Sequence, residues 1–201
     1  MRDISVDDGQ THFRVVIVVN AAIPAMEMQT ACFADDVATL QALLQTGIDP
    51  NHTTDNHIPP LAIAAMRGNI EIMRILLAAG ADVHFRGVED VTALHMAALW
   101  GQKAAAVLLI ESGAEVNVFE ETNCTPLDYA AARNYADVVK VLLAHGATFE
   151  SRNRWRTTAP EEALFRKHSD VLQAFEDAGF PIPSSAEMPN QGICGLHFML
   201  L

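Results

Sequence analysis

The apolar and polar positions of this chain recur with a period of 33 residues. Five glycines follow the period without a slip: Gly47, Gly80, Gly113, Gly146 and Gly179. Pairs of large aliphatic residues precede the first four of them, at 43–44, 76–77, 109–110 and 142–143. A period sustained in this way is typical of stacked copies of one supersecondary unit.

The clearest unit runs from residue 92 to residue 117 and predicts two helices. Thr92 can cap the first helix through its hydroxyl, and good helix formers follow it. Gly101 can take a positive φ and reverse the chain, and Gly113 is placed as a C′ residue of the second helix. One unit has too little apolar surface to fold alone, so the pattern predicts an all-α solenoid.

The unit resembles the ankyrin repeat. The T-P-L-H-x-A-A signature of that family corresponds to TALHMAA at 92–98 and TPLDYAA at 125–131, and its G-A-D-V-N corresponds to GAEVN at 113–117. The resemblance implies about five 33-residue helix-turn-helix units joined by β-hairpin fingers. We therefore divide the chain into an N-terminal extension (1–24), the array (25–182) and a C-terminal tail (183–201).

The end units depart from the pattern, as expected of caps with one face in water. Asp35 stands where the central unit has Gly101, and the last unit is rich in charge between 161 and 177. The apolar strip 13–19 suits a short strand or a cover for the first helix pair. The tail suits a disordered end, a strip folded back on the last helix, or a docking peptide.

The net charge is −12, from 25 acidic and 13 basic residues. This balance argues against a nucleic-acid partner, because phosphate binding relies on Lys and Arg. Solubility accounts for most of the acidity, and a basic partner is the alternative. A weaker alternative is contact with nucleic acid or a phosphopeptide through 152–156, where arginines alternate with other residues around Trp155.

The remaining bulk features concern location. Three scattered cysteines predict reduced thiols and hence a cytoplasmic protein, with the nucleus as a second possibility. The apolar run at 15–19 is too short to cross a bilayer, so we expect no membrane anchor.

No catalytic signature is found in the sequence: there is no glycine-rich phosphate loop, no H-E-x-x-H and no nucleophile elbow. We therefore expect no enzyme and no cofactor. His52 and His57 lie in one finger but lack a third ligand in register, so we expect no metal. For His95, the resemblance implies a structural hydrogen bond to a neighbouring turn.

The resemblance places variable, recognition-competent positions just before the T-P-L-H site and just before the turn between helices. In the fingers these positions are Asp55, Asn56 and Ile58; Val88, Glu89 and Val91; Glu121, Thr122 and Cys124; and Arg154, Trp155 and Thr157. On the first helices they are Met66 and Arg67; Leu99 and Trp100; Ala132 and Arg133; and Phe165 and Arg166. Exposed Trp, Met, Leu and Arg at such positions are typical of binding hot spots. Alternatively, Trp100 packs on its own finger and Trp155 on the cap helix.

The finger turns lack the usual glycine. His57, Asp90, Asn123 and Arg156 take its place. Asp and Asn tolerate positive φ better than His and Arg do, which predicts altered or mobile tips in the first and last fingers.

The sequence therefore predicts a monomeric, non-catalytic adaptor or inhibitor that binds a partner protein on the concave side of fingers and first helices. The alternative is a target-selecting subunit of an enzyme or ubiquitin-ligase complex that docks through the C-terminal tail. Asn117 and His84 also resemble the ankyrin sites of the iron- and 2-oxoglutarate-dependent asparaginyl hydroxylase, through an L-x5-[D/E]-V-N arrangement. The alternative for Asn117 is a structural hydrogen bond to the next finger.

Overall fold

Pairs of short helices stack side by side in the computed structural model, which describes residues 2–6, 13–17, 22–54, 57–150, 152–180 and 182. The first helix of each pair is α1 (Ala22–Phe33), α3 (Pro60–Arg67), α5 (Ala93–Leu99), α7 (Pro126–Ala132) or α9 (Ala159–Arg166). The second helix is α2 (Val37–Gln45), α4 (Ile70–Ala78), α6 (Lys103–Glu111), α8 (Ala136–Ala144) or α10 (Ser169–Asp177). The described residues thus form the predicted helical solenoid.

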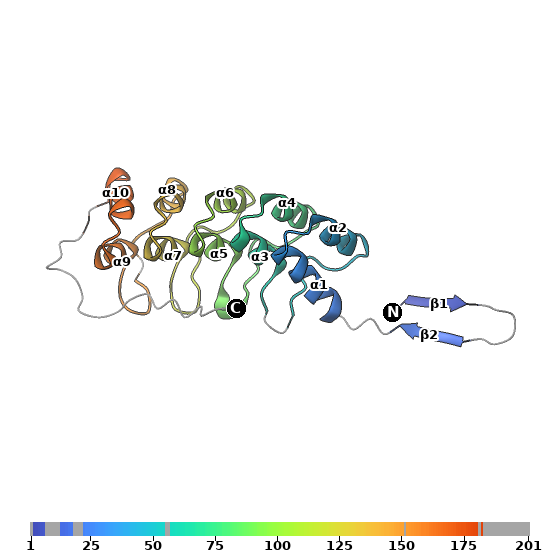
Figure 1. Cartoon of the computed structure of the whole chain (residues 1–201). Helices are drawn as coiled ribbons and strands as arrows, with labels where there is room; N and C mark the ends of the chain where they lie inside the picture. Colours follow the sequence, from blue (N-terminus) through green and yellow to red (C-terminus); the bar gives the residue numbers. More distant parts are fainter. Residues whose placement is uncertain are drawn as a thin grey trace.

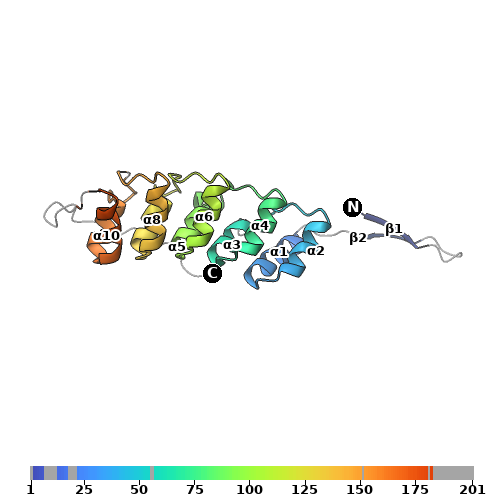
Figure 2. The ribbon, with the colours of Figure 1, turned by 90° about the horizontal axis from the view of Figure 1, so that it is seen from above.

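The helices form two rows, and loops extend from one of them (Figure 1). The second helices make the upper row, the first helices lie beneath it, and the loops before α3, α5, α7 and α9 extend below the first helices. We call these loops the fingers. Seen from above, the second helices lie next to one another along the array (Figure 2).

The N-terminal strip forms a hairpin of its own. β1 (Arg2–Val6) pairs antiparallel with β2 (Phe13–Ile17), with Arg2 opposite Ile17. The apolar strip is therefore a strand at 13–17, which is one of its two predicted alternatives. The tail at 183–201 lies outside the described residues.

Capping boxes start three of the first helices. The Thr92 hydroxyl accepts from the His95 backbone N–H, while the Thr92 N–H donates to His95 Nδ1 at 3.2 Å. Thr125 and Asp128 repeat the arrangement at α7, and Thr158 repeats it at α9 with the predicted glutamate partner. Each box satisfies backbone N–H groups that the first helical turn leaves unpaired, so each helix has a defined start.

Left-handed residues reverse the chain between paired helices. Gly101 has a φ of 70°, and Asp35 and Asn134 replace glycine there with φ values of 56° and 63°. His57 and Arg156 likewise take positive φ at the finger turns, as Asn123 does in the finger before α7. The expectation of altered or mobile tips in the first and last fingers stays a prediction, and residues 55–56 of the first finger lie outside the described residues. The unusual finger is the one before α5, where Glu89 has a positive φ inside the 3₁₀ turn η1 (Val88–Asp90).

One continuous core runs through all five helix pairs. Leu76, Leu109, Leu142 and Phe175 occupy the same position in successive second helices and are fully buried. Leu43, at that position in the first pair, is only partly buried. Burial at this end is incomplete because, among the described residues, no further helix pair packs on the outer side of the first one, as expected of a cap.

Candidate functional site

The fingers and first helices together form a surface with two rows of accessible side chains. Neighbouring fingers are joined by backbone hydrogen bonds, from Glu121 N to Glu89 O at 3.0 Å and from Arg154 N to Thr122 O at 2.7 Å. The finger row comprises the tips at 88–90, 121–123 and 154–156. The helix-end row comprises the C-terminal ends of α1, α3, α5, α7 and α9, which pack next to one another. The surface is therefore a rigid support for exposed side chains.

Trp100 is the largest exposed side chain in the helix-end row. It is the C-cap residue of α5, and 51% of its surface is accessible. α5 lies between α3 and α7, so Trp100 is central in the array. About half of the indole is accessible, as recognition requires, and packing of Trp100 on its own finger stays the alternative.

Other exposed apolar groups extend this surface. Phe165 on α9 is 58% accessible, and Val88 at a finger tip is also exposed. Phe33 at the end of α1 is 39% accessible and was not among the predicted positions. Its place exactly one period before Met66 is the signal that identifies it. Arg67, Glu121, Arg133 and Arg154 are exposed as predicted, and Met66, Glu89 and Thr122 are partly exposed.

Three of the predicted binding residues are buried, which is a correction. Val91, Leu99 and Cys124 belong to the hydrophobic core, and Cys124 has no accessible surface. Val91 and Cys124 immediately precede the N-caps of α5 and α7, where the chain turns inward between finger and helix. Three further variable positions, Ile58, Ala132 and Thr157, are also buried. Asp55 and Asn56 lie outside the described residues.

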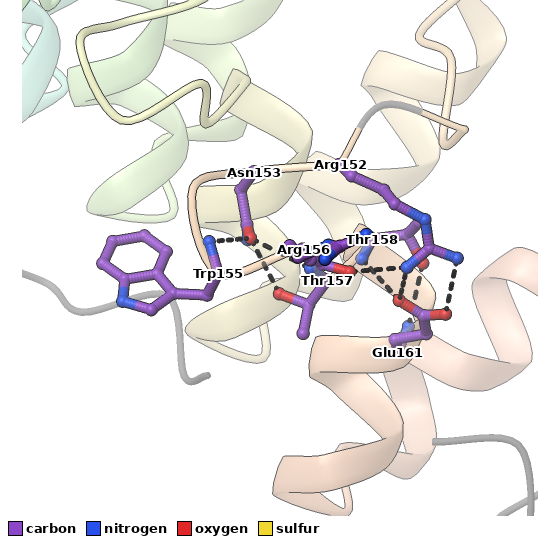
Figure 3. Close-up of polar contacts among 7 residues, drawn as sticks. All are labelled: Arg152, Asn153, Trp155, Arg156, Thr157, Thr158 and Glu161. Carbon is purple, nitrogen blue, oxygen red and sulfur yellow. Dashed lines mark hydrogen bonds and ion pairs between the residues drawn. The ribbon is translucent and has the colours of Figure 1, made fainter. Parts of the chain in front are cut away.

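Trp155 is intermediate between the two predicted alternatives. It is half-buried and packs against the core, so only part of the indole is accessible. Its backbone N–H donates to Asn153 Oδ1 at 3.0 Å, and the ring points away from the Arg152–Glu161 pair (Figure 3). Trp155 therefore offers less contact area than Trp100.

Most polar groups of the basic segment 152–156 form hydrogen bonds or ion pairs within the protein. The Arg152 guanidinium donates to Glu161 Oε2 at 3.1 Å and to the Arg156 carbonyl, so it holds the finger on α9 (Figure 3). Asn153 Oδ1 accepts from the backbone N–H of Thr157 at 3.1 Å and closes the turn. Only Arg154 and Arg156 keep side chains without a partner among the described residues, which weakens the nucleic-acid alternative.

His95 makes the hydrogen bond that the resemblance implies. Its Nδ1 accepts from Thr92, so Nε2 carries the proton and donates to the Cys124 carbonyl of the next finger at 3.2 Å. Burial lowers the pKa of His95 to about 4, so the ring is neutral. His95 is thus a link between units.

Asp128 replaces that histidine in the next unit and lies among other acids. Its carboxylate accepts from the Thr125 N–H and hydroxyl, both at 2.7 Å. Burial, opposed by the two hydrogen bonds from Thr125 and assisted by the nearby Glu162 and Glu120 carboxylates, raises the pKa of Asp128 to about 7. All three carboxylates are buried. The Asp128 carboxyl therefore titrates near neutral pH inside the fold.

The described residues offer little for catalysis or for holding a cofactor. No group of three or more His, Cys, Asp or Glu side chains among them could hold a metal ion. Burial raises the pKa of the Cys32 thiol to about 12, which makes it a poor nucleophile. A hollow beside His84, Arg86 and Glu115 has a volume of about 40 Å³, far below the roughly 300 Å³ of a small-molecule site. Within the same residues, no helix combines the length and apolarity needed to cross a membrane.

Asn117 joins one unit to the next. Its Nδ2 donates to the Gly146 carbonyl at 3.0 Å, and its Oδ1 accepts from the Thr148 N–H at 2.8 Å. This is the structural bond foreseen as the alternative role of Asn117. His84 holds the equivalent place one unit earlier and is exposed. Hydroxylation of either residue stays a prediction, and for Asn117 it requires local opening that breaks these bonds.

Fold and surface together define an α-solenoid of stacked helix pairs with hydrogen-bonded fingers. The family model for ankyrin repeats matches three copies over residues 28–120, and the single-repeat model matches residues 122–154. The chain belongs to the ankyrin-repeat family, whose repeats are generally protein–protein interaction modules without catalytic activity. A search of curated proteins finds no match. The pair α9–α10 lies beyond the matched residues and yet repeats the capping box and the helix pairing.

Proposed function

We propose that this chain is a non-catalytic adaptor or inhibitor that holds one partner protein against the helix-end row and the finger tips. The observation that carries the proposal is the exposure of Trp100, half of whose surface is accessible at the centre of the array. A large aromatic group on a rigid support gives much contact area and loses little entropy on binding.

The other residues of the proposed surface are predicted positions whose side chains are exposed or partly exposed. The surface contains Met66, Arg67, Val88, Glu89, Trp100, Glu121, Thr122, Arg133, Arg154 and the accessible part of Trp155. Arg67 is held by an ion pair with Asp35 at 3.0 Å, which orients its guanidinium before a partner arrives. Such orientation reduces the entropy lost on association.

The same proposal places the protein in the cytoplasm or nucleus as a monomer. Its support is that Cys32 and Cys124 are free thiols buried in the core. Reduced cysteines are typical of those compartments. Analytical ultracentrifugation tests the oligomeric state, and a concentration-dependent dimer would contradict it.

The proposed function is tested with Trp100→Ala and a matched surface control, Arg74→Ala. Arg74 is exposed on α4, a second helix, away from the helix-end row. Proteins captured by the wild type and by the control, but not by Trp100→Ala, are the expected partners. With a purified partner, we expect Trp100→Ala to weaken binding by about 30-fold. Unchanged binding would contradict the proposal, and a large fall in melting temperature would make Trp100 a packing residue.

A further inference from the structure

The C-terminal half of the helix-end row carries aromatic and cationic side chains and no carboxylate. α5 ends in Leu-Trp-Gly at 99–101, α7 in Ala-Arg-Asn at 132–134, and α9 in Phe-Arg-Lys at 165–167. In a chain with a net charge of −12, these ends form a local region of opposite sign. The first pair differs, because Asp35 stands at its helix end.

Arg133 and Lys167 are the cations in this region that are available to a ligand, and Arg133 is the one between the exposed aromatic groups. Several other basic groups are already paired: Arg67 with Asp35, Arg152 with Glu161, and Arg166 with Glu162. The Arg133 side chain is exposed and forms no hydrogen bond or ion pair with any described residue. Arg154 on the last finger shares this property. An exposed guanidinium with no internal partner can bind a carboxylate in a bidentate way.

Arg133 lies between the two most accessible aromatic groups of the row. Trp100, Arg133 and Phe165 belong to the consecutive first helices α5, α7 and α9, which pack side by side (Figure 1). Because packed helices lie about 8–10 Å apart, the three side chains span about 20 Å. An extended peptide covers that length with about six residues. The spacing therefore suits a short segment with an acidic centre and apolar flanks.

The finger row limits where such a segment can lie. Glu89, Asp90 and Glu121 are carboxylates at the tips before α5 and α7. They repel an acidic ligand at the tips and favour one that lies along the helix ends. At the last finger, Arg154 replaces Glu121 one period on, so the repulsion there becomes attraction.

We propose that the helix ends of α5, α7 and α9 bind an acidic segment of a partner protein, with apolar side chains on Trp100 and Phe165 and a carboxylate on Arg133. This inference rests on the proposed function, because it uses part of the same surface. It adds the chemistry of the partner: carboxylates between aromatic or aliphatic anchors.

The experiment is a selection of random peptides of about 12 residues, long enough to cover the row, displayed against the whole chain. Binding of the selected synthetic peptides is then measured by fluorescence polarisation. We expect enriched peptides to carry Asp or Glu between Phe, Trp or Leu. Trp100→Ala and Arg133→Glu should each weaken their binding by about tenfold or more, and the control Arg74→Glu by less than about twofold. Added salt should weaken binding to the wild type.

A charge exchange separates the carboxylate contact from a general loss of fold. Replacing the central Glu of a selected peptide by Lys should restore part of its binding to Arg133→Glu. Melting temperatures show whether the variants are folded. If Arg133→Glu does not fold, Arg133→Gln takes its place in the binding measurements.

The outcomes that overturn the inference differ from those that overturn the proposed function. Neutral or basic peptides that need Trp100 but not Arg133 would contradict the acidic partner and leave the proposed surface standing. Peptides that need neither residue would contradict both. An absence of enrichment would show that no short acidic segment suffices.

Discussion

At the scale of single residues, Asp128 is a side chain whose burial lowers the stability of the folded state near neutral pH. It is buried between Glu120 and Glu162, where its charged form is disfavoured, and its pKa is raised to about 7. In the unfolded chain a carboxyl titrates near 3.8. The native state therefore holds the proton more tightly, so Asp128 removes stability as the pH rises from about 4 to about 7.

Asp128→Asn should stabilise the protein at pH 7.5, by up to about 4 kcal/mol for a shift of about three units. The amide oxygen can accept from Thr125 as the carboxylate does, but it carries no charge. The gain should shrink towards pH 4, where Asp128 is protonated in the native state and about half protonated in the unfolded state. Urea unfolding at a series of pH values checks this, and an equal effect at pH 4 and pH 7.5 would contradict the argument.

His95 acts with the opposite sign over nearly the same pH range. Its native pKa of about 4 lies below the ordinary value of 6.5, so the unfolded state binds the proton more tightly. Stability is therefore lost as the pH falls from about 6.5 to about 4. Asp128 and His95 partly offset each other in the wild type.

Removal of Asp128 should expose the contribution of His95. In Asp128→Asn, the free energy of unfolding should rise by about 3 kcal/mol between pH 4 and pH 6.5. The reason is that the lowering of the His95 pKa by about 2.5 is then no longer offset by Asp128. The wild type should show a flatter profile over that range. A parallel profile in both proteins would mean that the two groups do not act as described.

At the scale of elements, Asn117 shows how neighbouring units are joined. It connects its own finger to the loop after α8 through Gly146 and Thr148. Asn117→Ala should lower stability by about 1 kcal/mol, because the two backbone groups lose their partner but are near solvent. Glu150→Ala is the control, since exposed Glu150 holds the same place one unit later. Equal effects in chemical denaturation would argue against a role of Asn117 between units.

The second helices differ in how completely neighbours bury them. Leu109 in α6 is fully buried, whereas Leu43 in α2 is partly buried. Leu109→Ala should cost about 2–5 kcal/mol, as deletions of buried leucine do, and Leu43→Ala should cost less. Urea melts of both variants measure the difference. Equal losses would contradict the view of the first unit as a cap.

At the scale of the whole molecule, stability should fall towards the ends of the array. α2 buries Leu40 alone, whereas α5 is buried over its whole length. Amide hydrogen exchange should therefore be fastest in α2 and slowest in α5 and α7, because end units have one neighbour and central units have two. Uniform protection would indicate that the array opens only as one cooperative unit.

The sequence by itself determined the architecture. Local chemistry decides the 33-residue period, the Thr caps and the residues at 35, 101 and 134 that reverse the chain. The structure confirms all of these predictions. Local signals suffice because each unit contacts only its neighbours and each neighbour has the same pattern.

Tertiary structure alone decided which variable side chains are accessible. Cys124 and Leu99 stand at family positions open to recognition, yet neighbouring elements cover them. Likewise, Asp128 lies near Glu162, which is 34 residues away in the chain. The physical reason is that a side chain's surroundings come mostly from the units before and after its own. Exposure and pKa therefore depend on residues about one period away, and no local pattern contains them.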